Sequence, residues 1–139
     1  MEQSYTSLSS GIVVRSVLAE QLDIPVYPVV ATEDATPPFA IYQRLGMRTE
    51  KTKVHDGIDT CSMAISVYTE DYNSGMELIE AIRRLFESRW WSEDMDDGSQ
   101  LRLDCSQVTD CGEDWVDDCY SQSITLEFKT NVSTKLNRQ

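Results

Sequence analysis

The chain has one histidine, His55, and histidine is the side chain that most often serves as a general base in catalysis. It lies in a charged stretch beside Lys53 and Asp56. A catalytic base needs a fixed geometry, so we interpret His55 as a solvated surface imidazole. The sequence also lacks the Gly-rich phosphate loop, the dinucleotide fingerprint and the His-Glu-x-x-His and Gly-x-Ser-x-Gly motifs. We therefore expect no catalytic residues and no enzyme activity.

Carboxylates are the second group that could do chemistry. Ten of the twenty-four acidic residues lie between Glu93 and Asp118, against one basic residue, Arg102. Such a density of oxygen ligands can bind calcium. The segment does not follow the calcium-loop pattern, because Met95 occupies a ligand position and predicted strands, not helices, flank the segment. We interpret residues 92–100 and 110–118 as acidic solvated turns and expect no metal site.

The four cysteines, Cys61, Cys105, Cys111 and Cys119, form no Cys-x-x-Cys pair. With His55 as the one available histidine, zinc binding is not expected. Cys61, Cys105 and Cys119 fall in strand-like segments, where a thiol packs as a small hydrophobe. A contact between Cys105 and Cys119 across two strands stays open. We expect buried free thiols and no cofactor.

Size and charge limit the class of protein. A length of 139 residues with 40% hydrophobic residues predicts a single domain over residues 1–139. The net charge of -12 would repel phosphates, so we expect no specific binding of nucleic acid, although DNA could pass such a surface without adhering. The acidic, polar start predicts no signal peptide, and no apolar run approaches the roughly 20 residues of a membrane helix. We expect synthesis in the cytosol and no membrane partner.

Hydrophobic periodicity predicts the elements that would position these groups. Ser9 or Ser10 could cap a first helix, and Asn73 or Ser74 a second. Pro28 cannot donate to a strand ladder, so its strand is expected at an edge or barely paired. The predicted elements are helices at residues 8–22 and 71–88 and strands at residues 26–31, 39–47, 59–69, 101–108 and 120–130.

Alternation within the predicted strands assigns side chains to faces. In the strand over residues 39–47, the pattern places Phe39, Ile41, Gln43, Leu45 and Met47 on one face. The clearest strand, over residues 59–69, has an apolar face and a face of small polar side chains, as expected for an antiparallel sheet with one exposed side. The order of elements predicts an α+β fold: a largely antiparallel sheet of four to five strands with two helices packed on one face. Residues 131–139 are expected to form a frayed tail.

From the first helix to Phe86, the chain resembles the tail completion, or tail terminator, proteins of long-tailed bacteriophages and prophages. The resemblance covers roughly two thirds of the chain and depends on the order and spacing of short motifs. The acidic segment over residues 93–119 departs from the family pattern. The carrying motifs are Val26-Tyr27-Pro28, Pro37-Pro38-Phe39-Ala40-Ile41-Tyr42, Met63-Ala64-Ile65-Ser66-Val67-Tyr68 and the predicted helix from Tyr72 to Phe86.

The resemblance implies a structural subunit that forms a ring, expected to be a hexamer. Such a ring caps the finished tail tube and joins it to the head connector, so the implied partners are other copies, the tube protein and the connector protein. The implied location is the virion tail, assembled in the cytoplasm of the bacterial host. Carboxylates lining the lumen would keep passing DNA from adhering.

A charged loop and a tryptophan are the candidate contacts with a neighbouring copy or the tube. Of Trp90 and Trp91, one ring is expected to close the core and the other to lie exposed beside Arg89 as an interface anchor. An exposed, mobile hairpin explains the charged loop equally well. Two other functions stay open: another head–tail adaptor or minor tail protein, and a small enzyme or ligand-binding domain that uses His55. The candidate interface residues are Arg48, Glu50, Lys51, Lys53, Asp56 and Trp91.

Overall fold

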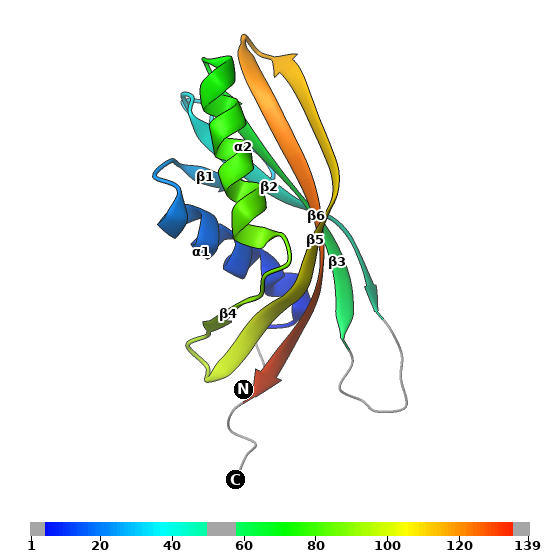
Figure 1. The fold of residues 1–139 in the computed structure, drawn as a ribbon. Helices are drawn as coiled ribbons and strands as arrows, with labels where there is room; N and C mark the ends of the chain where they lie inside the picture. The colour runs from blue at the N-terminus through cyan, green and yellow to red at the C-terminus, as the bar shows by residue number, and fades with distance from the viewer. Residues whose placement is uncertain (1–4, 50–57, 135–139) are drawn as a thin grey trace.

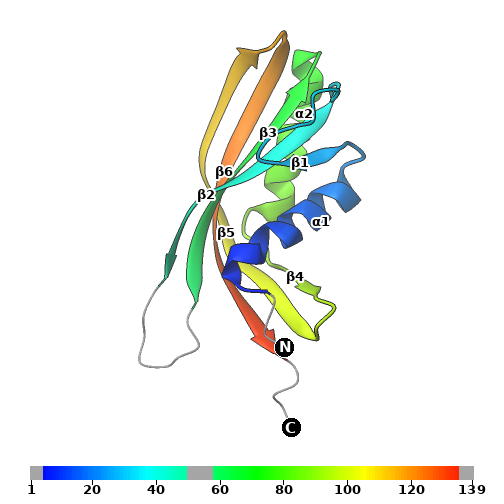
Figure 2. The ribbon, with the colours of Figure 1, turned by 180° about the vertical axis from the view of Figure 1, so that it is seen from behind.

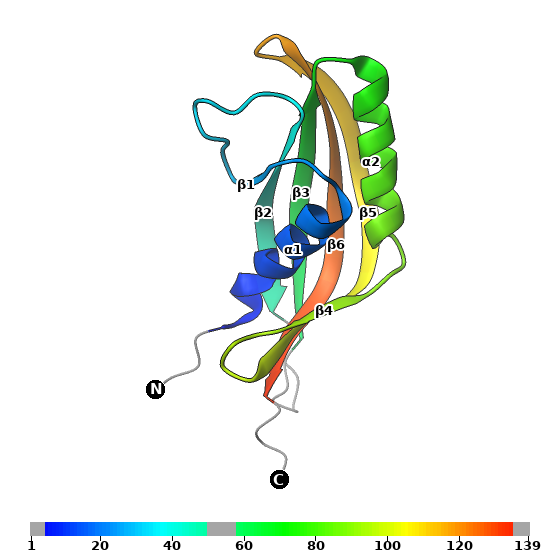
Figure 3. The ribbon, with the colours of Figure 1, turned by 90° about the vertical axis from the view of Figure 1, so that its left-hand side faces the viewer.

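The computed structural model describes residues 5–49 and 58–134, where one curled sheet carries both α-helices on the same side (Figure 1). The α+β fold with two helices on one face is confirmed (Figure 3). The sheet is larger than expected, because it has six strands, in the order β1-β2-β3-β6-β5-β4. The elements are η1 (Ser7–Ser10), α1 (Gly11–Gln21), β1 (Val26–Pro28), β2 (Phe39–Thr49), β3 (Asp59–Thr69), α2 (Tyr72–Phe86), β4 (Trp91–Asp94), β5 (Ser99–Val116) and β6 (Cys119–Thr134).

Strand β1 lies at one edge of the sheet, as Pro28 predicted. It pairs with β2 in parallel, with Val26 opposite Ala40, whereas the other strand pairs are antiparallel. Parallel neighbours need a long connection, and residues 29–38 supply it. The sheet is therefore mixed, with one parallel pair at its edge.

Strand β2 contains a bulge that the sequence pattern did not reveal. Its register with β3 shifts between Arg44 and Gly46, so Leu45 has no opposite residue. The extra residue reverses the alternation beyond it. Met47 thus lies opposite Cys61, on the same face as Ala40, and packs against the core. The expectation that Met47 shares a face with Phe39 is wrong for this reason.

The central strands β3 and β6 supply the middle of the core. The predicted apolar face of β3 is confirmed, since its alternate side chains are buried and meet buried side chains of β6. Ile65 lies opposite Ile124, and Met63 opposite Leu126. Apolar side chains of both helices cover this face. The largest fully buried residues include Phe86, Phe128, Leu18, Met63, Ile65, Ile82, Leu101, Leu103, Ile124 and Leu126.

The first helical segment begins earlier than predicted, with the 3-10 turn η1. Its cap is Thr6, whose hydroxyl accepts a hydrogen bond from the amide of Leu8. The hydroxyl of Ser9 accepts a hydrogen bond from the amide of Thr6 and so completes a capping box, whereas Ser10 makes no capping bond. The expected capping role of Ser9 or Ser10 is therefore corrected to Thr6. From there α1 buries Val13, Val14, Val17 and Leu18.

Helix α2 has the predicted apolar stripe and a different cap. Asp71 caps the helix through a carboxylate oxygen 2.9 Å from the amide nitrogen of Ser74. Asn73 and Ser74 lie inside the first turn, so neither is the cap. Ile82 and Phe86 are fully buried, and the half-buried Leu78, Ile79 and Leu85 pack against the same core. The helix thus lies on the sheet with its polar face outward.

The two acidic segments expected as turns belong mostly to strands. Residues 91–94 form β4, the second edge of the sheet, and a turn at Asp97 and Gly98 follows, as predicted. Strand β5 continues through residues 110–116, and β6 extends to Thr134. The expectation of a frayed tail is therefore wrong for residues 131–134, which belong to β6. Residues 135–139 lie outside the described residues. The acidic composition concealed both strand segments; β4 alternates half-buried and exposed side chains, whereas the side chains of residues 110–116 are all exposed.

The β5–β6 hairpin dominates the shape of the molecule. Its turn lies at one end of the sheet, and the ends of β2 and β3 that adjoin residues 50–57 lie at the other (Figures 1 and 2). The hairpin closes through a two-residue turn, Asp117 and Asp118, between the paired residues Val116 and Cys119. Both turn residues have positive φ, 51° and 64°, as a two-residue hairpin turn matching the strand twist requires.

Candidate partner interface

Of the charged-loop residues that the sequence indicated as interface candidates, Arg48 alone lies within the described part of the chain. Arg48 is exposed on β2 and lies opposite Thr60 of β3. Glu50, Lys51, Lys53 and Asp56 lie outside the described residues, as does His55. Their role in contacts with a neighbour stays a prediction.

The two tryptophans divide as expected, one toward the core and one toward solvent. Trp91 is half-buried on β4, and its Nε1 donates a 2.8 Å hydrogen bond to the carbonyl of Leu85. Its ring centroid lies 6.3 Å from that of Phe86, so Trp91 fastens β4 to the end of α2. Trp90 is 61% exposed. The interface role given to Trp91 stays a prediction, and the geometry offers Trp90 as the exposed ring.

Exposed arginines at the end of α2, together with Trp90 and Arg102, form what we call the arginine–tryptophan patch. The guanidinium of Arg102 lies 5.6 Å from the Trp90 ring centroid, within the range of a cation–π contact. Arg89 lies 5.2 Å from the Trp91 ring and donates a hydrogen bond to the carbonyl of Arg84. The first contact joins β5 to the segment after α2, and the second and third join that segment to β4 and to α2. The patch consists of Arg83, Arg84, Arg89, Trp90 and Arg102, all exposed.

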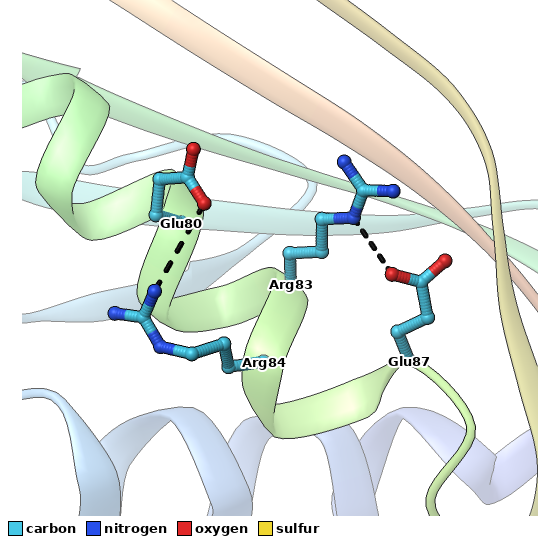
Figure 4. A network of polar contacts seen from close by, with 4 residues as sticks. All are labelled: Glu80, Arg83, Arg84 and Glu87. Carbon is cyan, nitrogen blue, oxygen red and sulfur yellow. Dashed lines mark hydrogen bonds and ion pairs between the residues drawn. The ribbon is translucent and has the colours of Figure 1, made fainter.

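Two arginines of the patch have partners on their own helix (Figure 4). Arg83 Nε lies 2.7 Å from Glu87, and this hydrogen bond raises the pKa of Arg83. Arg84 lies 3.9 Å from Glu80. Both pairs are exposed and one helical turn apart, a class of ion pair that contributes little to stability. The patch therefore holds four guanidinium groups against two carboxylates, around an open hollow of about 710 Å³ that Arg83, Arg84 and Arg89 help to line.

A second surface, which the sequence analysis missed, lies at the turn of the β5–β6 hairpin. Trp115 is 55% exposed, and its ring makes an edge contact with Tyr120 at 4.9 Å. Tyr120 makes a second edge contact with Tyr72 of α2 at 5.5 Å. Exposed carboxylates flank the rings. We call this surface the acidic tip and define it as Glu113, Asp114, Trp115, Asp117 and Asp118.

The acidic tip could have been found from one signal. Asp117-Asp118 stands between Val116 and Cys119, and an aspartate pair between strand-forming residues is a hairpin signal. The expected turn over residues 110–118 placed Trp115 in a loop, whereas Trp115 lies on β5 opposite Tyr120. The signal was present and was outweighed by the acidic composition.

A groove of about 350 Å³ lies between α2 and the hairpin, where Met76 and Ile79 face Gly112 and Ile124. Within residues 5–49 and 58–134, no group of three or more His, Cys, Asp or Glu side chains could hold a metal ion. The same part of the chain contains no helix long and apolar enough to cross a membrane.

The described thiols differ in their surroundings. Burial raises the pKa of Cys61 and of Cys119, which keeps both protonated and poorly nucleophilic near neutral pH. Cys111 is exposed. The expectation of buried free thiols is thus confirmed for Cys61 and Cys119, and the side chain of Cys105 lies outside the described atoms.

Comparison with known proteins shows the fold. No family model matches the sequence, and no curated protein matches it. Nineteen chains of solved structures match the fold. One is a chain in a structure titled "Virion of native gene transfer agent (GTA) particle", with a TM-score of 0.59 and 15% sequence identity. The match covers 94% of this chain and 99% of that chain, so the two share a fold over almost their full lengths.

Proposed function

We propose that this chain is a structural protein of a phage or prophage particle. The observation that carries the proposal is the shared fold, over nearly the whole of both chains, with a component of a gene transfer agent virion. The match covers 94% of this chain and 99% of that chain, at 15% sequence identity. We do not assign it an enzymatic role, and its conspicuous features are exposed surfaces.

Within that class, we propose the role of tail terminator. The ordered motifs from the first helix to Phe86 support this role through their resemblance to the tail completion family. The subunit would form a hexameric ring that caps the tail tube in the host cytoplasm and joins it to the head connector of the virion. Its net charge of -12 suits a ring through which DNA passes without adhering.

Deleting the gene from its phage or prophage tests the proposal. A tail terminator stops tube growth, so its loss should give tails of uncontrolled length that carry no heads. Tails of normal length detached from heads would identify a head–tail adaptor instead. Complete, infectious particles would overturn both roles. The wild-type gene supplied in trans should restore normal particles, and a variant with a disrupted core, Ile65→Asp, should not, because Ile65 is fully buried.

A further inference from the structure

Among the residues that the structure describes, the carboxylates of the acidic tip form no ion pair, although Arg83 lines the same groove as Glu113. Within residues 5–49 and 58–134, the ion pairs are Arg83–Glu87 and Arg84–Glu80, neither of which involves the tip. Asp117 and Asp118 stand at the turn itself, where the hairpin ends. Placing these like charges together is unfavourable unless an oppositely charged surface approaches them.

The arginine–tryptophan patch supplies that opposite charge at the other end of α2. Tyr72, at the first residue of α2, contacts the tip through Glu113, whereas Arg89 follows the last turn of the same helix. Fifteen helical residues separate the two ends, a length of about 22 Å at 1.5 Å per residue. The turn residues Asp117 and Asp118 of a chain are therefore too far from its own Arg89 to contact it, and we expect such a contact between chains.

Each surface also has an exposed tryptophan. Trp115 is 55% exposed at the tip and Trp90 is 61% exposed at the patch. Tryptophan and arginine are the residue types enriched among those that dominate binding energy at protein interfaces. Each ring is held in place by a neighbour, Trp115 by Tyr120 and Trp90 by Arg102, so both surfaces combine charge with a positioned apolar group.

We propose that the acidic tip of one copy docks on the arginine–tryptophan patch of a second copy. The contact joins two different surfaces, so a docked pair still has one open tip and one open patch for further copies. Such head-to-tail association closes into a ring when the rotation per subunit allows it, and otherwise extends. This proposal deepens the assembly role proposed above and rests on it, since it names the surfaces through which copies meet.

Two charge-removing variants test the contact. The tip variant carries Asp114→Asn, Asp117→Asn and Asp118→Asn, since asparagine tolerates the positive φ of both turn residues. The patch variant carries Arg84→Gln and Arg89→Gln. A control, Glu20→Gln with Asp23→Asn, removes exposed carboxylates at the end of α1. Thermal unfolding of each variant verifies that it is folded.

Light scattering over a range of protein concentrations measures self-association. Wild type and control should associate alike, and association should weaken as salt is raised, because screening acts on exposed charges. Each variant alone should associate at least about tenfold more weakly. An equimolar mixture of the two variants should form dimers that grow no further, because it holds one intact tip–patch pair per two chains.

Four results would overturn the proposal. The first is a wild type that stays monomeric up to about 1 mM, where even weak contacts populate. The second is unchanged association of either variant, and the third is a mixture of variants that fails to dimerise. Capture of the patch by the purified tube protein in place of a second copy counts equally against it. The gene deletion tests the particle role by a separate measurement, so a failure of one proposal can be distinguished from a failure of the other.

Discussion

The hydroxyl of Tyr72, at the start of α2, donates a 3.0 Å hydrogen bond to the carboxylate of Glu113 on β5, 41 residues along the chain. The bond ties the top of the helix to the hairpin that bears the acidic tip. It also raises the pKa of Tyr72 above the ordinary value of 10.0, because the bond requires the protonated phenol. The contact between the hairpin and the helix thus depends on the proton of the Tyr72 hydroxyl.

The first prediction concerns alkaline pH. The pKa of Tyr72 is higher in the folded state, so the contribution of its bond to stability is complete below pH 10.0 and is lost as the pH rises through the raised pKa. An absorbance titration of tyrosine ionisation should show a late-titrating phenol that Tyr72→Phe removes and Glu113→Gln shifts to lower pH. A titration unchanged by Glu113→Gln would contradict the assignment.

The second prediction concerns the cap of α2. Asp71→Ala should lower the free energy of unfolding by about 1 kcal/mol, since the amide of Ser74 loses its acceptor. Asn73→Ala, inside the first turn, is the control and should change stability by less than about 0.5 kcal/mol. Urea unfolding of both variants measures the difference. Equal losses would point to a cap at Asn73, the residue that the sequence pattern suggested.

The third prediction compares two glycines. Alanine is normally favoured over glycine within a helix, yet a Cβ on Gly75 of α2 would lie 2.8 Å from Oγ1 of Thr69. Thr69 is buried and donates to the carbonyl of Asp71, so it has little freedom to move. Gly75→Ala should therefore destabilise the protein by about 1–3 kcal/mol. Gly46→Ala, whose Cβ would meet no atom within 4 Å, should be close to neutral in the same thermal unfolding measurement.

The fourth prediction concerns thiol reactivity. Cys111 is exposed, so it should react rapidly with a thiol reagent under native conditions. Cys61 and Cys119 should react slowly, because burial both shields each sulfur and raises its pKa. Peptide mass mapping after timed labelling distinguishes the sites. Denaturant should bring Cys61 and Cys119 to the rate of Cys111, and comparable rates in the native protein would contradict the described packing.

The sequence predicted the bounds and buried face of an element best where its apolar and polar residues followed one regular period along the whole element. Strand β3 alternates buried and wetter side chains from Asp59 to Thr69, and its predicted bounds are those observed. The stripe of α2 was predicted equally well, because Ile82 and Phe86 recur on one helical face. In both elements local pattern and tertiary packing favour the same structure.

The pattern was misleading where one residue altered the register or where composition outweighed alternation. The bulge at Leu45 is a property of two paired strands, which one strand's sequence does not display. Residues 110–116 form a strand because β6 pairs with them, although their acidic composition is typical of a loop. The parallel pairing of β1 also depends on its neighbour. For the candidate interface, the sequence identified one tryptophan facing the core and one facing solvent, but not Trp115.

The turn at Asp117 and Asp118 has a further consequence for any partner that meets it. Two residues held at positive φ between paired strands leave the end of the hairpin little conformational freedom to lose on binding. The hairpin thus presents its charges in a preorganised arrangement before a partner arrives. A rigid hairpin end favours selective binding, because only a partner whose surface already complements its shape can bind without distorting it.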